Sequence, residues 1–96
     1  MVGAVGKDEF AGPALDLLDK AGADLSGVRH ETGPTGTALI LVGGDGENMI
    51  AVVPGANGLV DVAQAEAAVA ALSSTDLLML QLEVPADAVK AALKAA

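Results

Sequence analysis

A nearly unbroken apolar run at residues 77–82 (LLMLQL) constrains this chain more than any other feature of its sequence. Such runs are typical of strands in a parallel sheet, because helices cover both faces of that sheet. A strand of this kind needs neighbours on both sides, and residues 2–5 form the one run that could supply a parallel neighbour. We therefore expect the 96 residues to be an internal segment of a larger sheet.

The remaining pattern predicts an α/β fold in which helices connect the strands. Asp8 is a candidate cap for the first helix, and Asp61 and Gln64 have the spacing of a capping box at the start of another. In chain order the expected elements are a strand at 2–5, a helix that ends at Gly22, a loop at 23–36, strands at 37–42 and 49–53, a helix at 61–72, a strand at 77–82 and a helix at 86–96.

Two β-rich runs, TALILV at 37–42 and MIAVV at 49–53, flank the segment GGDGEN. Glycine, aspartate and asparagine tolerate the positive φ angles of tight hairpin turns, so we predict an antiparallel hairpin. The glycines do not form a phosphate-binding loop. Such a loop requires a following Lys and Ser or Thr and joins a strand to a helix.

Composition excludes several classes of function. Thirteen acidic residues against five basic ones give a net charge of −8, which argues against nucleic acid as a partner, since phosphates require Lys and Arg. The chain has no cysteine, so disulfides and thiolate metal sites are excluded, and a cytoplasmic location is compatible. No stretch of about 18 residues is free of charge, so we expect no membrane-spanning helix. The first residues lack the features of a signal peptide.

Glu83 has the most suggestive position of any ionisable residue, directly after the run at 77–82 and before Pro85. Ligands of open α/β sheets bind beyond the carboxyl ends of the strands, where Glu83 is expected to lie. A carboxylate accepts several hydrogen bonds from hydroxyls, which suits a sugar. An acid near a helix N-terminus is also stabilised by the helix dipole without any ligand, and spacing alone favours this second explanation.

Five motifs, taken together, resemble the ribokinase branch of the PfkB carbohydrate kinase family in their order and spacing. They extend over essentially all 96 residues. The motifs are Gly6-Lys7-Asp8-Glu9-Phe10, Pro34-Thr35-Gly36-Thr37-Ala38-Leu39-Ile40, Gly46-Glu47-Asn48, Pro54-Gly55-Ala56-Asn57 and Gln81-Leu82-Glu83-Val84-Pro85.

The resemblance implies one partial kinase domain over residues 1–96, with a Rossmann-like α/β/α core at 1–22 and 61–96. The hairpin at about 37–54 would form half of a β lid over the sugar and the contact of a homodimer. By the same resemblance, Ala38, Ile40 and Val52 are the apolar lid residues that close over the sugar. Glu83 matches the glutamate that accepts a hydrogen bond from a sugar hydroxyl.

For the intact protein, the resemblance implies transfer of the γ-phosphoryl group of ATP to the 5-hydroxyl of D-ribose. Magnesium and a monovalent cation such as potassium would assist. The Gly-Gly-Lys-Gly-Ala-Asn and Gly-Ala-Gly-Asp segments of the family have no counterpart here, and neither do its nucleotide and cation loops. We therefore expect this chain alone to bind no cofactor and to be inactive. Two alternatives remain open: a non-catalytic module that dimerises through the hairpin, and another sugar or nucleoside kinase of the family.

Overall fold

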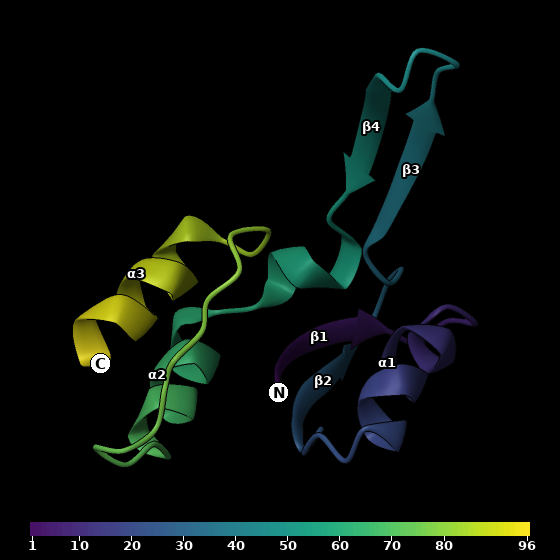
Figure 1. The fold of residues 1–96 in the computed structure, drawn as a ribbon. Coiled ribbons are helices and arrows are strands. Elements are labelled where there is room, and N and C mark those ends of the chain that lie inside the picture. The colour runs from purple at the N-terminus through teal and green to yellow at the C-terminus, as the bar shows by residue number, and fades with distance from the viewer.

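In the computed structural model, which describes residues 1–96, β1 (Val2–Gly6) and β2 (Gly27–Glu31) form a parallel pair. Helix α1 (Ala11–Lys20) connects the two strands (Figure 1). Parallel strands require such a crossover, because a tight turn cannot return the chain to the same end of the sheet. The prediction of Asp8 as the cap is wrong in position, because Phe10 is the N-cap residue of α1 and provides no side-chain cap. Asp8 lies two residues earlier, where its Oδ1 accepts hydrogen bonds from the N–H groups of Phe10 and Ala11, both at 3.2 Å.

The loop predicted at 23–36 is wrong, because this segment contains β2. No apolar run marks the strand, since Arg29 and Glu31 alternate with its other residues. Arg29 Nη1 lies 2.8 Å from Asp61 Oδ2, and Arg29 Nε lies 2.9 Å from Glu31 Oε1. Pairing with β1 and a contact with a residue far along the chain therefore stabilise β2. Neither the pairing nor this contact can be recognised from the local sequence pattern.

Helices α2 (Val62–Ala70) and α3 (Ala86–Ala95) confirm the two later helix predictions. Asp61 caps α2, because its side chain accepts a hydrogen bond from the N–H of Gln64 at 2.8 Å. The two helices lie side by side (Figure 1). None of the helices is both long enough and apolar enough to cross a membrane.

The strand predicted at 77–82 is also wrong, because the segment pairs with no other strand. It runs as an extended connection between α2 and α3 (Figure 1). Leu77, Met79 and Leu82 are 84%, 85% and 76% exposed, and Leu78 is the residue of the run that packs against the core. An apolar run is suited to a covered strand, but a strand forms only where a partner backbone is available, and β1 pairs with β2 alone.

The predicted hairpin is confirmed as β3 (Thr37–Val42) and β4 (Asn48–Val53), which pair antiparallel. Gly46 has a φ of +85° in the turn, a conformation that glycine adopts without steric cost. The hairpin projects away from the other elements (Figure 1), and every residue of its two strands is exposed.

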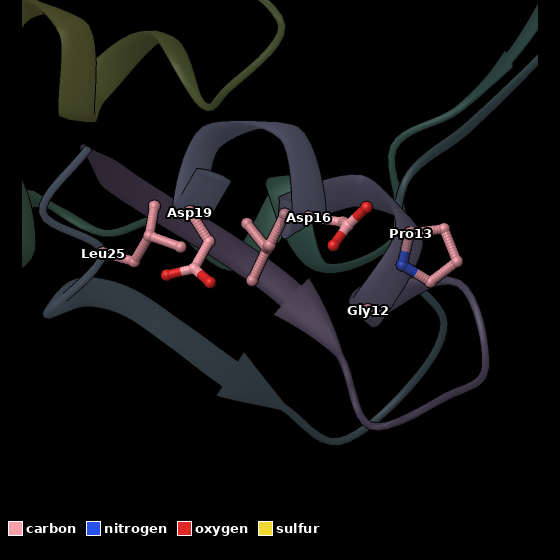
Figure 2. A pocket seen from close by; sticks show the side chains of 6 residues that line it. Gly12, Pro13, Asp16, Asp19 and Leu25 are labelled. Carbon is pink, nitrogen blue, oxygen red and sulfur yellow. The ribbon is translucent and has the colours of Figure 1, made fainter. Parts of the chain in front are cut away.

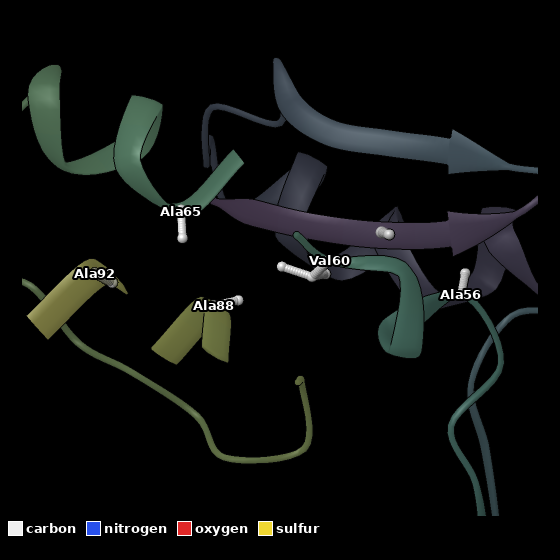
Figure 3. Packing of buried hydrophobic residues seen from close by; sticks show 6 residues of the cluster. Ala56, Val60, Ala65, Ala88 and Ala92 are labelled. Atoms are coloured by element: carbon white, nitrogen blue, oxygen red, sulfur yellow. The ribbon is translucent and has the colours of Figure 1, made fainter. Parts of the chain in front are cut away.

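The core is small and consists mainly of alanine. Eleven of the 96 residues are buried, so most large apolar side chains face outward. The main cluster joins β1, the 3-10 helix η1 (Gly55–Leu59), α2 and α3 (Figure 3). Its members are Ala4, Ala56, Val60, Ala65, Ala88 and Ala92.

Candidate functional site

An open groove of about 510 Å³ lies where the base of the hairpin meets the turn before α3. It is lined by Val52, Pro54, Gly58, Glu83, Val84 and Pro85. Val52 and Glu83 are candidate site residues from separate parts of the chain, and the fold brings them to one groove. The groove therefore combines a carboxylate with apolar side chains.

Glu83 occupies the bend between the extended segment and α3, and its side chain is exposed. Its N–H donates a hydrogen bond to Gln81 Oε1 at 2.6 Å, which steadies the backbone of the bend. The Glu83 carboxylate forms no hydrogen bond or ion pair within the chain, whereas the α3 N–H groups of Ala88 and Val89 donate to the carbonyl oxygen of Pro85. Glu83 is thus no side-chain cap for α3, and its oxygens are free to accept hydrogen bonds in the groove.

One face of the hairpin carries the other predicted residues. Ala38 lies opposite Val52, and Ile40 lies opposite Ile50. Residues directly opposite share a face, and the face alternates along each strand. Ala38, Ile40 and Val52 therefore lie together with Ile50, although only Val52 reaches the groove. Sequence reasoning missed Ile50, which the two-residue period from Val52 could have identified.

The opposite face of the hairpin is also apolar. We call it the outer face, formed by Leu39, Leu41, Met49, Ala51 and Val53. Leu41 and Met49 are 63% and 72% exposed. A contiguous exposed apolar surface on a protein is a mark of an interaction site.

The base of the hairpin is held by polar contacts from Asp8. Asp8 Oδ1 accepts a hydrogen bond from Thr35 Oγ1 at 2.6 Å, and Asp8 Oδ2 accepts one from the N–H of Thr35 at 2.7 Å. These bonds stabilise the ionised carboxylate and hold the pKa of Asp8 below its ordinary value.

A second groove, of about 550 Å³, lies on α1 and is slightly larger (Figure 2). It is lined by Gly12, Pro13, Leu15, Asp16, Asp19 and Leu25. Asp16 already pairs with Lys20 at 2.6 Å on the surface of the helix. None of the predicted site residues lies there, so the groove at Glu83 is the better candidate despite its smaller volume.

Several charged side chains of this chain are already paired with one another. The side chains form no group of three or more His, Asp or Glu residues that could hold a metal ion. Three of the five basic residues, Lys20, Arg29 and Lys90, already lie within ion-pair distance of carboxylates. A triphosphate needs several free cationic or N–H donors in one place.

Comparison with known proteins decides the family. The chain matches the pfkB family carbohydrate kinase model over residues 1–96. It belongs to the pfkB family of carbohydrate kinases. The ribokinase of Schizosaccharomyces pombe is 42% identical over 97 residues, an alignment that covers all of this chain and 30% of that relative.

Solved structures agree with this pfkB assignment. The ribokinase of Giardia lamblia has a TM-score of 0.79 and 34% identity, covering 98% of this chain and 30% of that one. Arabidopsis thaliana ribokinase, complexed with ribose and ATP, has a TM-score of 0.69 and 28% identity, covering 98% and 33%. The resemblance read from the five motifs is confirmed, and so is a partial ribokinase-like α/β fold. The chain spans about a third of the length of these pfkB relatives.

Proposed function

We propose that this chain supplies the lid hairpin and one wall of the sugar site in a ribokinase. The intact protein would transfer the γ-phosphoryl group of ATP to the 5-hydroxyl of D-ribose. Residues 1–96 form part of one kinase domain, with the lid at about 37–54. One observation carries the proposal: the unpaired carboxylate of Glu83 and the apolar side chain of Val52 line the same groove.

In this proposal Glu83 accepts hydrogen bonds from ribose hydroxyls, and the hairpin face with Ala38, Ile40 and Val52 covers the sugar. An apolar cover excludes water, which strengthens the hydrogen bonds beneath it because the local dielectric constant falls. The oxygens of Glu83 are well suited to this role, since no group of the chain bonds to them. Ribose would therefore be oriented by one charged acceptor and one apolar surface.

We assign ATP, magnesium and the monovalent cation to parts of the enzyme outside this chain, and expect the chain alone to be inactive. Phosphoryl transfer needs charge stabilisation around the phosphates and an oriented nucleophile, and the Glu83 groove offers one carboxylate. Incubation of the 96-residue chain with ribose, ATP and magnesium tests this assignment, and phosphorylation of ribose by that chain alone would contradict it.

Substitution of Glu83 tests the sugar site directly. In the intact protein, Glu83→Gln and Glu83→Ala should weaken ribose binding about tenfold or more, because a hydrogen bond to a charged group is worth ~1.5–3 kcal/mol. ATP binding should change less than twofold. Isothermal titration with each ligand measures both, and Glu66→Ala on the exposed surface of α2 is the control. Equal losses for ribose and ATP would refute the assignment.

A panel of sugars and nucleosides separates ribokinase from the alternative of another pfkB-family kinase. The same titration with fructose or adenosine in place of ribose should give weaker binding. If another member of the panel bound more tightly than ribose, that compound would be the proposed substrate. The role of Glu83 would then be tested with that compound.

The outer face of the hairpin supports a second role, a homodimer contact between two copies of the hairpin. Leu39, Leu41, Met49 and Val53 on this face are more than half exposed. They cannot also cover the sugar, because they lie on the face opposite to Val52. Sedimentation equilibrium measures the dimer. A stable dimer that binds no sugar would favour the alternative of a non-catalytic dimerisation module.

A further inference from the structure

Three of the five sequence motifs meet at the base of the hairpin, although they are far apart along the chain. The segment Pro34–Gly36, which we call the strap, leads into β3 and lies against the end of β1. On its other side, the carbonyl oxygen of Pro34 accepts a hydrogen bond from the N–H of Ala56 at 2.8 Å. The strap is thus held between the β1–α1 turn and η1.

Thr35 is the centre of this junction. It is 6% exposed, and its Oγ1 both donates to Asp8 Oδ1 and accepts a hydrogen bond from the N–H of Gly6 at 2.9 Å. Its N–H donates to Asp8 Oδ2. A buried polar side chain whose hydrogen bonds are all satisfied rigidifies its surroundings, since any displacement leaves groups unpaired.

The carboxylate of Asp8 suits a position that is surrounded by donors, because an ionised carboxylate only accepts hydrogen bonds. Its two oxygens accept hydrogen bonds from four donors, two from Thr35 and two from the N–H groups of Phe10 and Ala11. An amide in its place would direct an NH₂ group at one of those donors. The strap also packs so closely on β1 that a Cβ at Gly6 would collide with the backbone of Gly33 and Thr35.

The contacts at this junction also affect the orientation of the hairpin. Every residue of β3 and β4 is exposed, so side-chain packing along the two strands does little to fix the orientation of the hairpin. The contacts at the base of the hairpin therefore fix most of its orientation. Thr37, the first residue of β3, donates from its Oγ1 to the carbonyl oxygen of Thr35 at 3.2 Å. A shift of the strap therefore shifts the face with Ala38 and Val52 relative to Glu83.

We infer that Asp8 and Thr35 are positioning residues for sugar capture, which set the angle of the hairpin over the Glu83 groove. The inference rests on the proposed function, because it assumes that the hairpin covers a sugar. Neither residue lines the groove, so both act through the hairpin and not by touching the substrate. Loss of their contact leaves Glu83 in place but the apolar cover misaligned.

Kinetics of the intact protein test the inference. Asp8→Asn and Thr35→Val should raise KM for ribose about tenfold, the loss expected from about one net hydrogen bond of positioning energy. KM for ATP should stay within about twofold. Thr35→Ser, which keeps the hydroxyl, should behave like the wild type. Asp76→Asn is the control, because Asp76 accepts local hydrogen bonds from Ser73 in a turn after α2.

Hydrogen–deuterium exchange separates this inference from the proposed function. Asp8→Asn should speed exchange at residues 36–38 and 54–57 and leave α2 and α3 unchanged. If the wild type phosphorylates no ribose, the proposed function is refuted. The exchange measurement then still shows whether Asp8 and Thr35 fix the orientation of the hairpin.

Three results would overturn the inference: unchanged exchange at the base, an unchanged KM for ribose in folded variants, or equal losses for ribose and ATP. Failure of both Asp8→Asn and Thr35→Val to fold would overturn it as well. In that case the two residues would be required for the stability of the whole fold and not specifically for the orientation of the hairpin.

Discussion

The alanine cluster at α2 and α3 and the β-hairpin expose their apolar residues to very different degrees. Around α2 and α3 the contacts are made by alanines, and Ala88 is 2% exposed. On the hairpin, the larger residues Ile40 and Leu41 are 60% and 63% exposed. Small side chains let the helices approach closely, whereas large exposed ones provide area for a partner or ligand. The alanine cluster therefore contributes to stability, whereas the two faces of the hairpin offer surface for contact.

The largest expected effect is on stability, and it is tested by replacing alanine with leucine once in the cluster and once on the hairpin. Ala88→Leu should lower the free energy of unfolding by about 1–3 kcal/mol, because the added atoms have no space in the packed cluster. Ala51→Leu, on the exposed outer face, should change it by less than about 0.5 kcal/mol. Urea unfolding followed by circular dichroism measures both. Similar losses at the two sites would remove the distinction between the regions.

A second prediction divides the hairpin into its two faces. Ile50→Ala should weaken ribose binding by the intact protein about fivefold, because part of an apolar side chain no longer becomes buried when the lid closes. Leu41→Ala should leave ribose binding unchanged and weaken the proposed dimer instead, because Leu41 lies on the outer face. Titration with ribose and sedimentation equilibrium provide the two measurements. If both variants lowered ribose binding equally, the division of faces would be wrong.

The smallest expected effect concerns the acid sensitivity of the helical region. A hydrogen bond from Arg29 and another from the N–H of Gln64 hold the pKa of Asp61 below its ordinary value. The ionised carboxylate therefore stabilises the fold above the unfolded pKa of about 4, and this contribution disappears as pH falls through the lower pKa of the folded chain.

Asp61→Asn should consequently be less stable than the wild type at pH 6, and the difference should shrink below about pH 4. Urea unfolding at pH 6 and pH 3 measures it, and Asp45→Asn at the hairpin tip provides the same change in net charge. A difference between Asp61→Asn and the wild type that is as large at pH 3 as at pH 6 would contradict the role of the Asp61 carboxylate.

Local chemistry made much of this fold predictable. The turn that contains Gly46 and the Asp61 cap of α2 depend on residues within a few positions of one another, and both are found as expected. The second half of the capping box does not form, because the Gln64 side chain donates instead to the carbonyl oxygens of Gly3 and Gly27. β2 and the segment at 77–82 were mispredicted because strand formation depends on a distant partner. Arg29 shows the difficulty, since its contact with Asp61 joins residues 32 positions apart.

The candidate site divides in the same way. The family resemblance pointed to Glu83, Ala38, Ile40 and Val52 one by one, and the family itself was readable from the order and spacing of the motifs. That Val52 and Glu83 share a groove, and that Asp8 reaches Thr35 at the base of the hairpin, emerged from the fold.

The sequence by itself determined the hairpin, the starts of α2 and α3, and the family, because each depends on nearby residues or on their order along the chain. Only the tertiary structure decided which strand pairs with β1, which candidate residues meet in one groove and what holds the hairpin at its base. The physical reason is that pairing, packing and buried hydrogen bonds join groups that are distant in sequence, and no local pattern specifies their partners.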